Sequence, residues 1–209
     1  MKIMVWNVRG LIRVKEHKMQ EIIDRWFTGW RCFQNYSHAL NERIWVLWSD
    51  DFQVSLIDIT DQSITTSIKL DDHSFFFSAI YGCNEDMDRR RLWSHLYSNK
   101  SIILDEPWFL IREFNFTVHP SESFNFFESQ LINSDMKEFI EAKNRIPVFD
   151  HVTFGPLFTW INKHLDGFIA RKLDKVLVNS SCHSRYAQSH VKFLAPNLSN
   201  HYPAYILLQ

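Results

Sequence analysis

The spacing of hydrophobic residues along the chain predicts three amphipathic helices. Met19, Ile22, Ile23 and Trp26 recur at the 3.6-residue period of a helix with one apolar face, and Gly29 follows as a stop signal. Two later stretches show the same period, each with an apolar stripe that we expect to face the core. The predicted helices are Val14–Trp26, Met87–Tyr97 and Ser134–Lys143.

Shorter apolar runs, separated by turn residues, predict strands. Between Trp30 and Gly82 five such runs follow one another with short connections, which favours antiparallel pairing among all five. They are Trp30–Tyr36, Arg43–Trp48, Gln53–Ile59, Ser63–Leu70 and Phe75–Tyr81. Other predicted strands are the opening run around Ile3 and Val5, Trp108–Ile111, Leu157–Ile161, Leu173–Val178, His190–Leu194 and Ala204–Leu208. With no repeat and no linker, residues 1–209 are expected to form a single α/β domain rich in antiparallel strands.

Composition narrows the possible functions. Hydrophobic residues make up 45% and charged residues 22%, so the chain can bury a core. The formal net charge of −1 excludes a global electrostatic grip on nucleic acid, so any such contact must use a local patch. Aromatic residues reach 15% with only 5 glycines, which favours strands and leaves few places for glycine-built phosphate loops.

Cysteine spacing and the lack of long apolar runs indicate an intracellular protein. Cys32, Cys83 and Cys182 lie far apart without a C-x-x-C pair, so neither a zinc site nor a disulfide framework is expected. No apolar run approaches the ~20 residues of a membrane span. The opening segment, Met1–Asn7, is too short for a signal peptide. We therefore expect a nuclear or cytoplasmic location and no contact with a membrane.

Polar residues gather where the predicted strands end. Side chains at the ends of several strands of one sheet system can converge on one site, and Asp, Glu, Asn and His are residues that hold a hard cation or position a water. The residues concerned are Asn7, Tyr81, Glu113, Asn115, Asp174, Asn200 and His201. Each one alone is compatible with an ordinary hydrogen-bonded loop residue, and the set is more informative than its members.

The order of several motifs resembles one family over nearly the whole chain. The opening segment Met1–Gly10 is similar to the first strand of the endonuclease/exonuclease/phosphatase superfamily, and more closely to the endonuclease domain of plant-type LINE (non-LTR) retrotransposons. Glu113-Phe114-Asn115 resembles the family's Gly-Asp-Phe-Asn motif. Further similar segments, in family order, are Asn35–Ser37 with Arg43–Trp48, Ala79–Gly82, Pro107–Leu110, His119–Ser123, Phe158–Lys163, Ala170–Asn179 and Leu198–Pro203.

The resemblance implies a four-layer α/β/β/α sandwich of two mainly antiparallel sheets flanked by helices. It also implies a Mg²⁺-dependent phosphodiesterase that nicks DNA and acts as a monomer. Carried onto matching positions, Asn7 and Asn200 would hold the metal, and Tyr81 would contact the phosphate. Glu113 would activate water and Asn115 would polarise the scissile phosphoryl oxygen. Asp174 would pair with His201, and His201 would donate to the phosphate in the transition state.

Three departures from the family pattern indicate impaired catalysis. The family has a further strand after the first helix, ending in the Glu that is the main metal ligand. Here the predicted helix ends at Trp26, which indicates that the strand and its Glu are deleted. Gly-Asp has become Arg112-Glu113, which adds bulk and moves the carboxylate by roughly 1.5 Å against a tolerance of about 0.5 Å. Asn200 replaces an Asp, and a neutral amide is a weaker Mg²⁺ ligand than a carboxylate.

Several other residues leave alternatives open. Glu16 or Glu21 on the first helix could replace the lost metal ligand, although a solvated helix face is the ordinary interpretation. Arg89 and Arg90 on the second helix could contact the DNA backbone, or simply begin a solvated helix. Arg171 and Lys172 are further candidates for DNA contact.

Two functional hypotheses follow. The chain is either a LINE-type endonuclease with weakened cleavage or a non-catalytic remnant that keeps the fold with at most weak DNA binding. A small-phosphoester phosphatase of the same superfamily is a third, less favoured class, because the motifs match the retroelement branch.

Overall fold

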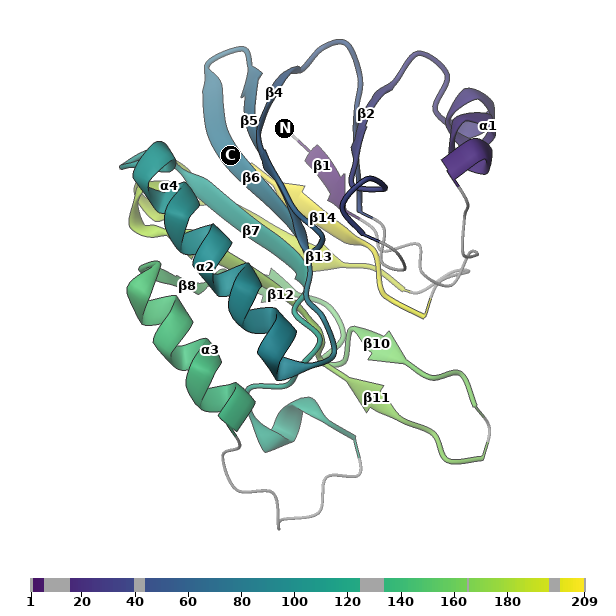
Figure 1. The fold of residues 1–209 in the computed structure, drawn as a ribbon, viewed down its shortest axis with the longest axis vertical. Coiled ribbons are helices and arrows are strands. Elements are labelled where there is room, and N and C mark those ends of the chain that lie inside the picture. The colour runs from purple at the N-terminus through teal and green to yellow at the C-terminus, as the bar shows by residue number, and fades with distance from the viewer. Residues whose placement is uncertain are drawn as a thin grey trace.

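The computed structural model describes residues 2–5, 16–39, 44–124, 134–164, 166–195 and 200–208. Figure 1 shows a mixed α/β fold in which strands from both ends of the chain lie beside each other. In chain order the elements are β1 (Lys2–Val5), α1 (Glu16–Trp26), β2 (Arg31–Gln34), β3 (Trp45–Trp48), β4 (Gln53–Ile59), β5 (Ser63–Leu70), β6 (His73–Tyr81), α2 (Asp86–Ile103), β7 (Trp108–Glu113), the 3₁₀ turn η2 (Pro120–Glu122), α3 (Ser134–Arg145), β8 (Val148–Asp150), β9 (Thr153–Phe154), β10 (Trp160–Ile161), β11 (Ala170–Arg171), β12 (Asp174–Asn179), α4 (Ser180–Arg185), β13 (His190–Phe193) and β14 (Ala204–Leu207).

The largest sheet has six strands in the order β4-β5-β6-β7-β12-β8. Its neighbouring strands run antiparallel except β6 and β7, which are parallel and are joined by α2. A parallel pair needs such a long crossover, whereas β4, β5 and β6 are joined by tight turns. The sheet therefore combines an antiparallel meander with one β-α-β unit.

Three smaller sheets complete the strand structure. β1-β14-β13-β9 forms a four-stranded sheet, which places the first and last strands side by side, and β2-β3 and β10-β11 are two-stranded sheets. The predicted antiparallel pairing through five successive strands is wrong at one step, because β3 belongs to a different sheet from β4. Val46 and Trp48 of β3 instead pack in the same hydrophobic cluster as Ile64 and Phe77 of the six-stranded sheet. Packing these apolar faces on each other buries surface that continued edge-to-edge pairing would leave exposed.

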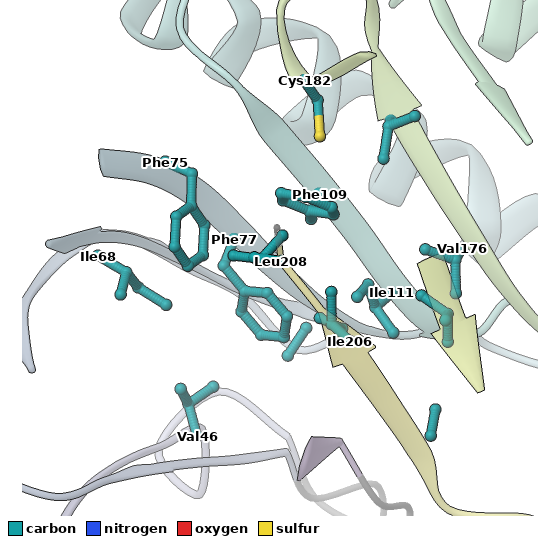
Figure 2. Close-up of a cluster of buried hydrophobic side chains, with 14 of the residues drawn as sticks. Val46, Ile68, Phe75, Phe77, Phe109, Ile111, Val176, Cys182, Ile206 and Leu208 are labelled. Carbon is teal, nitrogen blue, oxygen red and sulfur yellow. The ribbon is translucent and has the colours of Figure 1, made fainter. Parts of the chain in front are cut away.

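Two hydrophobic clusters cover the two faces of the six-stranded sheet. One face packs Leu92 and Leu96 of α2 and Phe139 of α3 against Trp108 and Leu110 of β7. The other face contributes the alternate strand residues and meets β3, β13 and β14, as Figure 2 shows for part of the cluster. We call the second of these the inner face; its members include Phe77, Phe109, Ile111, Val176 and Val178.

The predicted elements agree with the structure best in two strands of the large sheet and less well at the ends of other elements. β4 and β5 have the predicted bounds, and α2 and β7 run further than predicted, to Ile103 and Glu113. The apolar stripes are only partly buried, because Trp26, Tyr97 and Ile140 are exposed. The mixed α/β class is confirmed, while the four-layer arrangement and the deletion of a strand stay predictions. Among the described helices, none has the length and apolar character needed to cross a membrane.

Candidate active site

Three predicted site residues form a row across the centre of the six-stranded sheet. Tyr81 of β6 pairs in register with Glu113 of β7, and Glu113 pairs with Asp174 of β12. All three are buried. Along each strand, alternation places them on the inner face, with Ala79, Ile111 and Val176 respectively. The fold thus puts two carboxyl groups and a phenol at one end of a hydrophobic surface.

His201 reaches this row from a separate segment near the C-terminus. An antiparallel bridge between Trp160 and His201 fixes that segment, with Tyr202 N–H donating to Thr159 O at 2.9 Å. The His201 ring is fully buried, and its Nδ1 lies 3.0 Å from Asp174 Oδ2. Its Nε2 lies 3.2 Å from Glu113 Oε2. The predicted hydrogen bond between Asp174 and His201 is confirmed, and Glu113 lies on the other side of the ring.

The charges around the ring shift its titration. Burial alone would lower the pKa of His201, but the Asp174 and Glu113 carboxylates hold that pKa above the ordinary value for histidine. Burial alone would raise the pKa of Asp174, and the charges of His201 and Arg112 bring that pKa below its ordinary value. Thr159 also contributes by hydrogen bonding, and its Oγ1 accepts from the Asp174 N–H at 2.9 Å. The arrangement favours an ionised Asp174 beside a protonated His201.

Arg112 joins the same group, which the alternation of β7 does not predict. Register pairs it with Lys175, so an extended backbone would turn its side chain to the helix-covered face. Its φ is instead +120°, and its Nη1 lies 3.1 Å from Asp174 Oδ1 and 3.4 Å from Tyr202 O. The side chain of Arg112 is 6% exposed. The only signal in the sequence for this role is a charged residue at the end of the apolar run Trp108–Ile111. The sequence indicates added bulk at Arg112 and predicts no partner for it.

The loop after β7 is held tightly against the end of β6. Gly82 N–H donates to Glu113 O at 2.8 Å, and a Cβ at Gly82 would lie 3.0 Å from Phe114 O. A side chain here would crowd that carbonyl, so glycine suits the close approach of the two backbones. Asn115 has a φ of +58°, which asparagine tolerates, and its Nδ2 donates to Gly82 O. Asn115 thus lies directly after the row, engaged with the backbone.

The predicted metal ligands are placed less completely. Asn7 lies outside the described residues. The backbone carbonyl of Asn200 accepts a hydrogen bond from Ile161 N–H at 3.1 Å, next to the bridge that positions His201. Glu21 is exposed on α1, and Glu16 begins that helix. The metal-binding roles of these residues stay predictions.

The four predicted DNA-binding residues occupy different surroundings. Arg89 is buried, donates to Cys83 O and Asn84 O, and lies over the Phe116 ring, all contacts within the fold. Arg90 is exposed and pairs with Glu138. Arg171 is exposed at the end of β11, and the backbone N–H of Lys172 donates to Glu122 O. Arg171 and Lys172 precede Asp174 closely in sequence, so they are the two nearest to the row along the chain.

A second buried ion pair lies on the helix-covered face of β12, the strand that carries Asp174 on its inner face. Lys175 Nζ contacts both carboxylate oxygens of Glu122, at 2.9 and 2.8 Å, and also Lys172 O. Burial lowers the pKa of Lys175, and the Glu122 charge opposes that effect. This pair was not predicted, although Glu122 lies in one of the motifs that carry the family resemblance.

The described residues do not fit a Mg²⁺ ion at the row. Mg²⁺ is held by carboxylates that can turn oxygen atoms toward it. Here Asp174 is shared between the Arg112 guanidinium and the His201 ring, and Glu113 lies against that same ring. Within the described ranges, no group of three or more His, Cys, Asp or Glu side chains is arranged to hold a metal.

Comparisons with known proteins show the fold of the chain. No known protein family and no curated protein matches it by sequence. Among solved structures, the endonuclease domain of TRAS1, a telomere-specific non-LTR retrotransposon, matches over 100% of this chain and 98% of that domain, with a TM-score of 0.75 at 10% identity. TDP2 of D. rerio, complexed with a single-stranded DNA product, matches over 99% of this chain and 97% of that one, with a TM-score of 0.61 at 9% identity.

A further structure agrees with these two. TDP2 of C. elegans matches over 98% of this chain and 73% of that one, with a TM-score of 0.58 at 12% identity. At these identities the similarity shows the architecture alone. From its first strand to its last, this chain has the fold of a non-LTR retrotransposon endonuclease domain, in agreement with the resemblance in its sequence.

Proposed function

We propose that this chain is a DNA-contacting relative of the retrotransposon endonucleases in which phosphodiester cleavage is impaired. Support for the endonuclease origin comes from the fold together with the convergence of Tyr81, Glu113, Asp174 and His201 from widely separated segments. The proposal includes the four-layer sandwich lacking one strand, a monomeric state and a nuclear or cytoplasmic location.

One observation supports impairment above all others, namely that Asp174 is paired with the Arg112 guanidinium as well as with His201. In the family pattern a metal ion supplies the positive charge next to the phosphate, and the acids hold that ion. In this chain Asp174 is the partner of His201 rather than a metal-holding acid, and the Arg112 guanidinium beside it places a positive charge next to the row. That charge would repel a divalent ion bound at the row and so weaken its binding.

The residues that remain can still perform part of the chemistry. Asp174 orients the His201 ring and keeps it protonated, so Nε2 is positioned to donate a proton or a hydrogen bond to a phosphoryl oxygen. Glu113 faces the same nitrogen and would compete for it. A protein with this arrangement binds phosphate more readily than it cleaves phosphodiesters.

A plasmid nicking assay tests the proposal. With millimolar Mg²⁺, the purified chain should nick supercoiled DNA no faster than its His201→Ala variant. Reverting Glu113→Asp and Asn200→Asp should restore little, because the main ligand of the family site is missing. Cleavage that is abolished both by EDTA and by His201→Ala would contradict the impairment, and Glu16→Gln and Glu21→Gln would then show whether either residue supplies the metal ligand.

The non-catalytic alternative is favoured by the same ion pair and differs only in residual cleavage. Fluorescence anisotropy with a labelled duplex measures the DNA contact directly. We expect weak binding that falls as salt rises, and weaker binding for a double variant, Arg171→Ala with Lys172→Ala. A matched double variant, Lys137→Ala with Lys192→Ala, serves as the control, and an equal loss in both would contradict contact through Arg171 and Lys172.

A further inference from the structure

The Arg112 guanidinium has a buried edge without a partner. Its Nη1 takes the contacts to Asp174 and Tyr202, whereas Nε and Nη2 are buried and make no hydrogen bond to the described residues. A buried donor without an acceptor costs about 1–3 kcal/mol, and more when it carries charge. A guanidinium placed only to neutralise Asp174 gives no reason for two such donors.

The geometry of that edge indicates the kind of group it accepts. Nε–H and one Nη2–H point the same way from the planar guanidinium, and such a fork matches two oxygen atoms of one carboxylate or phosphate. Both nearby carboxylates are engaged elsewhere, Asp174 through Nη1 and His201, and Glu113 against the His201 ring. A fork that has no acceptor among the described residues fits an oxyanion from outside the group.

The backbone at Arg112 supports the same interpretation. A φ of +120° is a conformation that side-chain-bearing residues rarely adopt, and such strain costs of order 1–3 kcal/mol. Lys175, the register partner of Arg112, keeps to the helix-covered face and finds both oxygens of Glu122 there. Arg112 instead reaches across to the inner face, where its Nη1 lies 3.1 Å from Asp174 Oδ1.

We propose that Arg112 binds a phosphate oxyanion directly through its Nε–Nη2 edge, so that phosphate binds at this site without a divalent cation. The inference rests on the proposed function, and it assigns to Arg112 the neutralising role that a metal has in metal-dependent phosphodiesterases. Because both nitrogen atoms are buried, the phosphate must displace the groups that cover the edge.

Thermal unfolding in EDTA is the first test. Inorganic phosphate should raise the melting temperature of the wild-type chain in a saturable way, compared with chloride at equal ionic strength, because it binds only the folded state. Arg112→Lys keeps the charge but loses the fork, and should weaken phosphate affinity by about tenfold or more. Arg31→Lys, the same exchange at an exposed arginine on β2, is the matched control and should leave phosphate affinity unchanged.

The direction in which Glu113→Gln changes phosphate affinity separates direct binding from metal-mediated binding. If Arg112 holds the phosphate, loss of the neighbouring negative charge should leave phosphate affinity unchanged or strengthen it. If a metal ion held by Glu113 carried the phosphate, the same change would weaken it, and Mg²⁺ would be required. Stabilisation that appears only with Mg²⁺ therefore overturns the proposal, as does the absence of any phosphate-specific stabilisation.

An NMR measurement on the wild-type chain avoids dependence on the folding of variants. The Nε–H resonance of a buried arginine exchanges slowly and reports directly on its acceptor. Phosphate in EDTA should shift the Arg112 resonance, and an unchanged resonance at saturating phosphate would overturn the proposal.

A short oligothymidylate distinguishes the two sources of phosphate. Binding of the oligonucleotide in EDTA with the same sensitivity to Arg112→Lys assigns the site to the nucleic-acid backbone. Binding of inorganic phosphate alone keeps the oxyanion site and contradicts the proposed DNA function. Failure of the phosphate arm with intact duplex binding contradicts this inference and leaves the proposed function standing.

Discussion

Two buried cationic side chains on neighbouring strands of one sheet differ in their hydrogen bonding and in their backbone geometry. Lys175 lies in β12, contacts both oxygens of Glu122 and stays on the face that alternation assigns to it. Arg112 lies opposite Lys175 in β7 and has a φ of +120°. Two of its nitrogen atoms make no hydrogen bond to the part of the chain that the structure describes. An ion pair that serves only the fold tends to satisfy its hydrogen bonds, whereas a strained and unsatisfied one indicates a site that expects a ligand. We therefore interpret the Glu122 pair as structural and the Arg112 group as functional.

The largest expected difference is in the cost of losing one partner from each group. Asp174→Asn removes the charge that balances Arg112 in a fully buried position, and should lower the free energy of unfolding by about 3–5 kcal/mol. Lys175→Met leaves Glu122, whose side chain is 13% exposed and can regain water. That change should cost only about 1–3 kcal/mol. Urea unfolding of both variants checks the order, and an equal or reversed cost would mean that both groups are structural.

A smaller difference in the free energy of unfolding is expected between glycine and alanine variants at Arg112 and at Lys175. At Arg112 the strain favours glycine, so Arg112→Gly should be more stable than Arg112→Ala by about 1–3 kcal/mol. At Lys175, within a regular strand, Lys175→Gly should be less stable than Lys175→Ala by roughly 0.5–1 kcal/mol. The same urea experiment on four variants tests this reversal. The same order at both positions would show that the φ of Arg112 carries no strain.

The smallest effect is the response of the Lys175 pair to alkaline pH. Burial lowers the pKa of Lys175, so in the folded state it releases its proton at lower pH than in the unfolded chain. Between its lowered pKa and the unfolded value near 10.5 the unfolded chain binds more protons, and stability from this group rises with pH. The stability of wild type relative to Lys175→Met should therefore increase on going from pH 8 to 10.5.

That experiment must compare wild type with Lys175→Met, because buried thiols change the free energy of unfolding with pH in the opposite direction to Lys175. Burial raises the pKa of Cys32 to about 12. Above pH 9 the unfolded thiol ionises first, and stability falls by up to about 1.4 kcal/mol per pH unit in both proteins alike. A relative stability that stays flat or falls would contradict the assignment of a lowered pKa to Lys175.

The sequence by itself determined several local elements and the pairing of two site residues. Apolar runs bounded by turn residues predicted β4 and β5 with their observed bounds, and the family resemblance implied that Asp174 pairs with His201. The strands follow from short-range patterns of apolar and turn residues, whereas the pairing follows from the resemblance of several motifs in family order. The same reasoning could not separate β3 from β4 into different sheets, because both continuations satisfy the same alternation.

Only the tertiary structure decided which charges meet. Arg89 begins a helix like any solvated arginine, yet the fold buries it against backbone carbonyls. Alternation assigns Arg112 to the helix-covered face. Its backbone instead has a φ of +120°, and its side chain contacts Asp174, a residue 62 positions away. The energy of a buried charge depends on partners that distant segments supply, so it is decided by packing and desolvation, which no local pattern in the sequence records.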